Sequence, residues 1–136
     1  MSRENVEVAR ATMEAFARRD FDGVLARWHA DGEWRPAISP GGLEGATYVG
    51  HDGVRRWGAE LEESWETFEL VDATFEAVGD RVLGLAKVHA RGSSSGVEID
   101  APLAQVWEIE EGKVRRLTGF FTQAEALEAV GLRGAE

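Results

Sequence analysis

The chain has 136 residues, of which 43% are hydrophobic, and this size and composition predict one domain with one hydrophobic core. Its formal net charge of −10 repels phosphate backbones and anionic lipid headgroups, which argues against binding to nucleic acid or to a membrane surface. The absence of cysteine excludes disulfides, thiolate nucleophiles and sulfur-ligated metals.

No segment has the character of a membrane span or a secretory signal. The apolar runs are all too short to cross a bilayer, and the chain is charged from Arg3 onward, so we expect a cytoplasmic protein. A helical first half precedes a strand-rich second half without a linker or repeat. This order predicts a single α+β domain over residues 1–136.

Two helices are predicted at the start of the chain. Apolar residues recur at helical spacing from Glu4 to Arg19, and Ser2 is available as a cap. Asp20 then caps a second, short helix, which residues 29–32 end. Three apolar residues of the second helix share one face: Val24, Leu25 and Trp28.

A short strand and a third helix follow. The strand signal covers Glu33 to Ile38, and the Gly- and Pro-rich segment at 39–50, SPGGLEGATYVG, predicts a loop at the mouth of a pocket. Asp52 can cap the third helix. Its buried stripe is predicted to hold Val54, Trp57, Leu61 and Trp65.

The second half predicts an antiparallel meander with turns at Gly79-Asp80, at GSSSG and at Glu111-Gly112. The expected strands are Phe68 to Val78, Arg81 to Arg91, Val97 to Glu110 and Lys113 to Phe121.

A closing helix is predicted after the last strand. Thr122 and Glu125 form a capping box, Leu127 and Val130 supply an apolar face, and Gly131 is a C-terminal stop. Long antiparallel strands twist and curl, so helices laid on the concave side should close the sheet into a cone around a small-molecule pocket.

Four segments in a fixed order carry a resemblance to a known family: RRDFDGVLARWHADGEWRP, YVGHDGVRRW, QVWEIEEGKV and AEALEAVGL. The chain resembles the SnoaL-like polyketide cyclases of the nuclear transport factor 2-like superfamily, which also contains ketosteroid isomerase. The resemblance implies a cone-shaped, mostly antiparallel sheet, a deep apolar pocket, no metal or organic cofactor, and a homodimer through the outer sheet face. It does not imply one activity, because the same fold supports several.

The isomerase mechanism needs a carboxylate base with a tyrosine and a protonated carboxyl as oxyanion donors. When the sequences are matched through DFDG, EWRP and QVWEI, Arg35 stands at the position of the base. Thr12 stands at that of the tyrosine and Gln105 at that of the protonated carboxyl. A guanidinium is not a base at neutral pH, so this mechanism is disfavoured. Thr122 stands where many SnoaL-like sequences have an aspartate, and this puts aspartate-driven cyclisation in doubt.

Four polar residues are the candidate catalytic groups: Arg35, His51, His89 and Gln105. His51 either moves a proton at the pocket mouth or pins the loop to the third helix. His89 alternates with Lys87 and Arg91, so it belongs to a basic clamp if that face is concave, or to a solvated face or dimer contact if it is convex, which we favour.

Arg35 is expected to face the cup and to orient an oxygen of the ligand, unless an internal carboxylate such as Glu33 or Glu44 is its partner. Gln105 shares the concave face with Trp107, where it either binds a ligand carbonyl or is a satisfied core amide. Aromatic residues either line the cup or fill it: Trp28, Trp34, Tyr48, Trp57, Trp65, Trp107 and Phe121.

Two functions follow from these residues. The first is a cofactor-independent cyclase, isomerase or hydratase acting on an apolar polycyclic, isoprenoid or polyketide-like carbonyl compound. The second is a non-catalytic ligand-binding or dimeric assembly module with the same cup.

Overall fold

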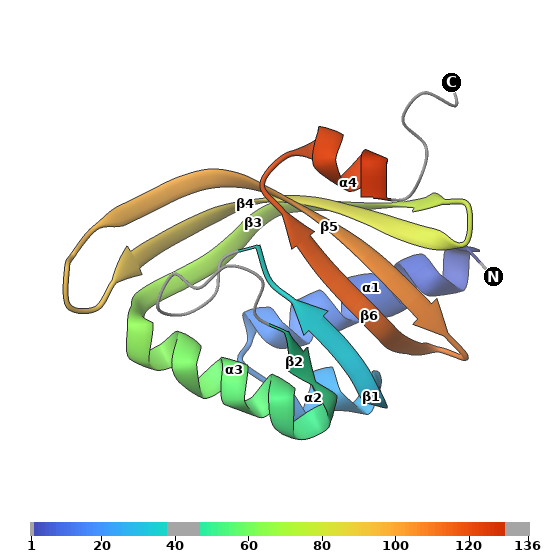
Figure 1. Cartoon of the computed structure of the whole chain (residues 1–136), viewed down its shortest axis with the longest axis horizontal. Helices are drawn as coiled ribbons and strands as arrows, with labels where there is room; N and C mark the ends of the chain where they lie inside the picture. The colour runs from blue at the N-terminus through green and yellow to red at the C-terminus, as the bar shows by residue number, and fades with distance from the viewer. Residues whose placement is uncertain (1, 38–46, 130–136) are drawn as a thin grey trace.

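The computed structural model describes residues 2–37 and 47–129, which form a curved, open six-stranded sheet with helices on both faces (Figure 1). The strand order is β2-β1-β6-β5-β4-β3, and every pairing is antiparallel except that of β1 with β6. The helices are α1 (Ser2–Ala17), α2 (Phe21–Ala26), α3 (Gly50–Ser64) and α4 (Gln123–Ala129). The strands are β1 (Trp28–Arg35), β2 (Tyr48–Val49), β3 (Trp65–Val78), β4 (Arg81–Gly92), β5 (Glu98–Glu110) and β6 (Lys113–Phe120).

The predicted α+β class and curved, mostly antiparallel sheet are confirmed. The four long strands match the expected meander to within a few residues, because the turns between them carry strong local signals. At the last hairpin, Glu111 and Gly112 both have positive φ, 53° and 79°, which is the backbone of a two-residue turn that matches the twist of its strands.

Two predicted caps are confirmed. The Asp20 carboxylate accepts a hydrogen bond from the Gly23 backbone N–H at 3.0 Å, and Thr122 Oγ1 accepts one from the Glu125 N–H at 3.1 Å. Asp52 is not a cap, because α3 begins earlier at Gly50 and places Asp52 in its first turn. Helix α1 also begins earlier than predicted, at Ser2.

Three sequence predictions near helix and strand ends are wrong. Trp28 begins β1 rather than extending α2, since its segment pairs with β6. Trp65 begins β3 instead of continuing the stripe of α3. Tyr48 and Val49, predicted as loop, pair with Trp34 and Glu33 as the short strand β2. Ile38, Glu44, Val130 and Gly131 lie outside the described residues.

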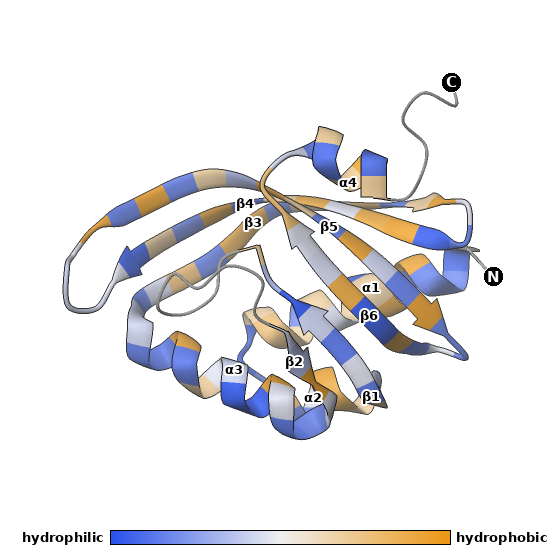
Figure 2. Ribbon diagram, in the orientation of Figure 1, coloured by the Kyte–Doolittle hydropathy of each residue, from blue (hydrophilic) through white to orange (hydrophobic). Residues whose placement is uncertain are grey.

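The sheet separates two apolar clusters because successive residues of a strand point to opposite faces. On β5, Trp107 packs with α1, α2 and α3 on the concave side, whereas Ala104 and Val106 pack with Ala126 of α4 on the convex side. Figure 2 shows that apolar residues, in orange, and polar residues, in blue, are interspersed along the strands. Of the helices described, none is long and apolar enough to cross a membrane.

Candidate functional site

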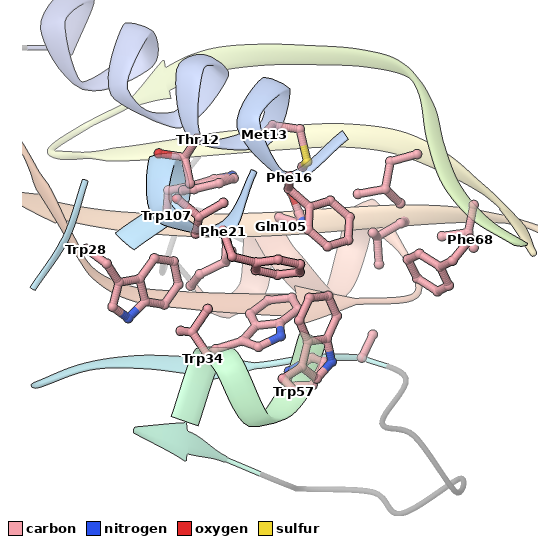
Figure 3. Close-up of a pocket in the computed structure, with 18 residues that line it drawn as sticks. Thr12, Met13, Phe16, Phe21, Trp28, Trp34, Trp57, Phe68, Gln105 and Trp107 are labelled. Atoms are coloured by element: carbon pink, nitrogen blue, oxygen red, sulfur yellow. The ribbon is translucent and has the colours of Figure 1, made fainter. Parts of the chain in front are cut away.

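A cavity of about 70 Å³ lies between the concave face of the sheet and the helices α1, α2 and α3 (Figure 3). Aromatic side chains from six elements make up much of its wall: Phe16, Phe21, Trp28, Trp34, Trp57, Phe68 and Trp107. Aliphatic side chains such as Met13, Leu70 and Leu103 fill the rest. A small, mostly apolar cavity therefore lies between the sheet and the helices.

Contacts between rings fix the shape of this wall. Trp34 and Trp57 meet edge to face with centroids 5.3 Å apart, and Phe16 packs on Trp57 at the same centroid distance. Phe75, which is not part of the wall, contacts Trp107 with ring centroids 6.2 Å apart. Such aromatic pairs add about 0.5–1.5 kcal/mol each beyond their buried area, so this part of the pocket is rigid.

Two polar side chains, Gln105 and Thr12, line the cavity within the described residues. The Thr12 hydroxyl already donates to the Val8 carbonyl at 2.7 Å. Gln105 is only 4% exposed, and its amide makes no hydrogen bond within residues 2–37 and 47–129. An amide without a partner in an apolar cavity is costly, and it can donate to and accept from a ligand.

The four tryptophans of the wall add indole N–H groups that have no hydrogen-bond partner in the described part of the chain. Two of these groups face glycine backbone: a β-carbon would lie 2.7 Å from Trp28 Nε1 at position 32 and 3.1 Å from Trp107 Nε1 at position 84. Glycine at these positions therefore makes room for the indoles. In Figure 3 the nitrogens of Trp34 and Trp57 lie on one side of the pocket.

Arg35 lies outside the cavity, which corrects the expectation that it faces the cup. Its side chain is 46% exposed and contacts Glu33 Oε1 at 2.8 Å. Glu33 also accepts from Arg116 at 3.4 Å, and Arg116 reaches Glu108. Partial burial raises the pKa of Glu33, but the charges and hydrogen bonds of Arg35 and Arg116 together hold it below its usual value. Of the two kinds of partner considered for Arg35, a ligand or a carboxylate of the protein, the structure shows the carboxylate of Glu33.

The two histidines proposed as proton donors are also outside the cavity wall. His51 Nε2 lies 3.0 Å from the Trp28 carbonyl oxygen and ties the start of α3 to β1. His89 occupies the convex face, half-exposed, with Nδ1 3.4 Å from Asp100 Oδ1. Lys87 and Arg91 share this face and pair with Asp72 and Glu98. The convex alternative for His89 is thus the observed one.

Tyr48 is 5% exposed but packs behind the cavity rather than in its wall. Its hydroxyl donates to Glu60 Oε1 at 2.7 Å, and the Arg56 guanidinium lies over its ring. Burial, followed by the hydrogen bond and negative charge of Glu60, raises the pKa of Tyr48 to about 12. Tyr48 therefore stays a neutral donor at physiological pH.

Two further predicted ligand contacts lie elsewhere. Trp65 packs beside Phe68 at the start of β3, and Phe121 is 47% exposed after β6. Four further wall residues are not among the ligand contacts predicted from the sequence: Met13, Phe16, Phe21 and Phe68. The spacing of Met13 and Phe16 on α1 indicated a buried face, but only the packing of that face over the sheet makes it a pocket wall.

Comparison with known families identifies this architecture. A sequence profile of the SnoaL-like domain matches residues 9–117. The chain belongs to the SnoaL-like family. A search of functionally curated proteins returned no match.

Several solved structures resemble this SnoaL-like chain over nearly its full length. An NTF2-like protein of unknown function from Burkholderia pseudomallei is 30% identical, with a TM-score of 0.77 and coverage of 94% of this chain and 97% of the other. TerC, co-crystallised with polyporic acid, is 26% identical, with a TM-score of 0.74 and coverage of 94% and 98%. A proposed polyketide cyclase from Xanthomonas campestris pv. campestris shares the fold at 20% identity, with a TM-score of 0.76 and coverage of 95% and 98%.

Proposed function

We propose that the pocket binds an apolar cyclic compound that carries a carbonyl oxygen, with Gln105 as the residue that recognises this oxygen. The observation behind the proposal is one buried amide without a partner in the described residues, set in a wall of tryptophan and phenylalanine. Aromatic walls favour planar apolar groups through buried area, and a single polar group orients them. The similar TerC was co-crystallised with polyporic acid, which supports a small-molecule ligand for this pocket.

Replacing Gln105 with leucine tests this assignment. Gln105→Leu keeps the approximate volume but removes the donor, so acetophenone should bind about twofold to tenfold more weakly, as expected for the loss of one neutral hydrogen bond. The free energy of unfolding should stay the same or rise, because the variant removes a buried amide that has no partner in the described chain.

Calorimetry with acetophenone and with cumene, its hydrocarbon analogue, separates recognition of the oxygen from general packing. Cumene should bind the variant at least as tightly as the original protein. Equal acetophenone affinity for the two proteins would show that Gln105 does not contact the oxygen. Failure of both compounds to bind the original protein would contradict the proposed pocket function itself.

Catalysis of cyclisation is the second candidate function. Gln105 can polarise a carbonyl toward attack, and the aromatic wall can hold a flexible chain in a folded form. None of the described lining residues is a carboxylic acid or a histidine, so we assign proton transfer to no side chain. A linear diketone whose aldol closure and loss of water give a cyclic enone provides the assay, since the enone absorbs in the ultraviolet and turnover would distinguish an enzyme from a binding protein.

Homodimer formation through the convex face is a separate proposal. Half-buried Leu85, Phe120 and Leu127 surround the convex cluster, and exposed Phe121 extends its apolar area. We expect sedimentation equilibrium to give twice the chain mass of 14.9 kDa, and Leu85→Glu to lower it to one chain. The matched control is Val49→Glu, at an exposed apolar residue of β2. A single-chain mass for the original protein at high concentration would refute the dimer.

A further inference from the structure

The inner cavity is too small for the ligands that its wall suits. Its volume is about 70 Å³, whereas an apolar cavity that holds benzene has about 150 Å³ and pockets for drug-sized ligands have about 300–1,000 Å³. A ring compound therefore fits only if part of the wall moves outward. The direction of that movement decides which ligands the protein can take.

A second, larger space lies behind one side of this wall. It is a groove of about 400 Å³ between the C-terminal end of α1 and β3. Met13 and Phe16 of α1 and Phe68 and Leu70 of β3 line both the cavity and the groove. Figure 3 shows Met13, Phe16 and Phe68 along this side of the cavity. These shared side chains border both spaces.

The shared side chains differ in how firmly they are held. Phe16 contacts the rings of Phe21, Trp57 and Phe68, and the Arg19 guanidinium lies over it at 4.7 Å. Met13, by contrast, has a flexible unbranched side chain that adapts to irregular spaces. Phe68 contacts the rings of Phe16 and Trp65, but it is only partly buried and belongs to β3, the edge strand of the sheet. Met13 and Phe68 are thus the wall members that can move.

We propose that the groove is a second subsite of the pocket, occupied by an unbranched apolar tail on the ring that the inner cavity holds. This inference rests on the proposed function and narrows its ligand class from compact polycycles to single-ring carbonyl compounds with a linear acyl or alkyl substituent. When Met13 and Phe68 turn aside, the combined space reaches the range of pockets that enclose such molecules.

The charges around the groove favour a neutral tail. Arg19 lines the groove, but its guanidinium already donates to the carbonyl oxygens of Phe16 at 3.1 Å and Phe68 at 2.5 Å. Glu69 also lines the groove and would repel a carboxylate at the end of a tail. The remaining residues, Ala17, Thr67 and Val71, are small or apolar. With one cation, whose donors are already engaged, and one anion, the groove offers no net charge that would offset the cost of burying an anionic tail.

A series of phenyl alkyl ketones tests the subsite, because its members share the ring and carbonyl and differ only in tail length. Calorimetry should show a gain of about twofold to fourfold in affinity per added methylene from acetophenone to octanophenone. A benzoyl-substituted alkanoate of matched length should bind more weakly than its neutral counterpart. Ala17→Phe, which fills the groove from the end of α1, should abolish the gain with tail length.

Thr67→Phe fills the same groove from β3 and replaces Ala17→Phe in the experiment if that variant fails to fold. Ala124→Phe, at an exposed position on α4, is the matched control and should keep the gain. An equal gain with tail length in the groove-filled and original proteins would overturn the subsite, as would tight binding of acetophenone with no dependence on tail length. Failure of every ketone to bind would overturn both the subsite and the proposed function.

Discussion

Replacing Trp107 with alanine should lower the free energy of unfolding by about 3–5 kcal/mol, the range for removing a large aromatic side chain from a core. Trp107 is 1% exposed at the centre of β5 and contacts Phe75, and a β-carbon at position 84 would touch its indole. Rigid neighbours cannot collapse into the space it leaves. Because domains of this kind are stabilised by only about 5–15 kcal/mol, the variant should be close to unfolding at room temperature.

Urea denaturation followed by far-ultraviolet circular dichroism measures this loss without relying on tryptophan fluorescence. Trp107→Phe should cost much less, because it keeps a ring and removes an indole N–H that has no partner in the described chain. Trp65→Ala, at a half-buried tryptophan outside the cavity wall, is the matched control with a smaller expected loss. A loss below about 1 kcal/mol for Trp107→Ala would mean that the residue lines a space able to close, contrary to the packing described.

The phenol of Tyr48 should titrate near pH 12 rather than near its ordinary value of 10.0. Burial disfavours the phenolate, and Glu60 both accepts the hydroxyl proton in a hydrogen bond and repels the negative charge. Tyr48 is the only tyrosine in the chain, so the near-ultraviolet absorbance of phenolate reports on this residue alone.

The shift also makes stability depend on pH in the alkaline range. The folded-state pKa is above the unfolded value, so the contribution of Tyr48 is fully present below pH 10.0 and is lost as the pH rises to about 12. Tyr48→Phe should remove this part of the pH dependence. Glu60→Gln keeps a hydrogen-bond acceptor without the charge and should lower the pKa part of the way. Phenolate formation near pH 10 with unchanged circular dichroism would contradict the buried hydrogen bond.

Local sequence signals predicted much of the sheet. The turns at Gly79 and at Glu111-Gly112 need positive φ, which the two glycines supply at low cost. The strict alternation of Leu103, Gln105 and Trp107 also predicted correctly that these side chains share the concave face, because the phase along an unbroken strand is set by its own apolar residues. Capping at Asp20 and Thr122 is equally local.

Local sequence signals could not predict which face of the sheet Arg35 occupies. This face depends on the pairing of β1 with β6, whose register shifts between Trp28 and Glu33. After this shift Trp34 faces the cavity, so the next residue, Arg35, points to the opposite face. Neither strand carries a signal of this shift, because the two segments are about 80 residues apart. The prediction that Arg35 faces the pocket, which was based on its position along the first strand of the family, is therefore wrong.

The sequence by itself determined the fold class and the long meander, since these follow from turn chemistry, periodicity and composition. Tertiary structure alone decided which of the predicted polar groups lie outside the cavity and how large the cavity is. It joined Met13 on α1 to Phe68 on β3 in one wall and left the Gln105 amide facing it, while Arg35, His51 and His89 formed contacts elsewhere. The physical reason is that the size of the cavity and the side chains that reach it depend on packing between distant segments. Strands, turns and caps depend mainly on neighbouring residues.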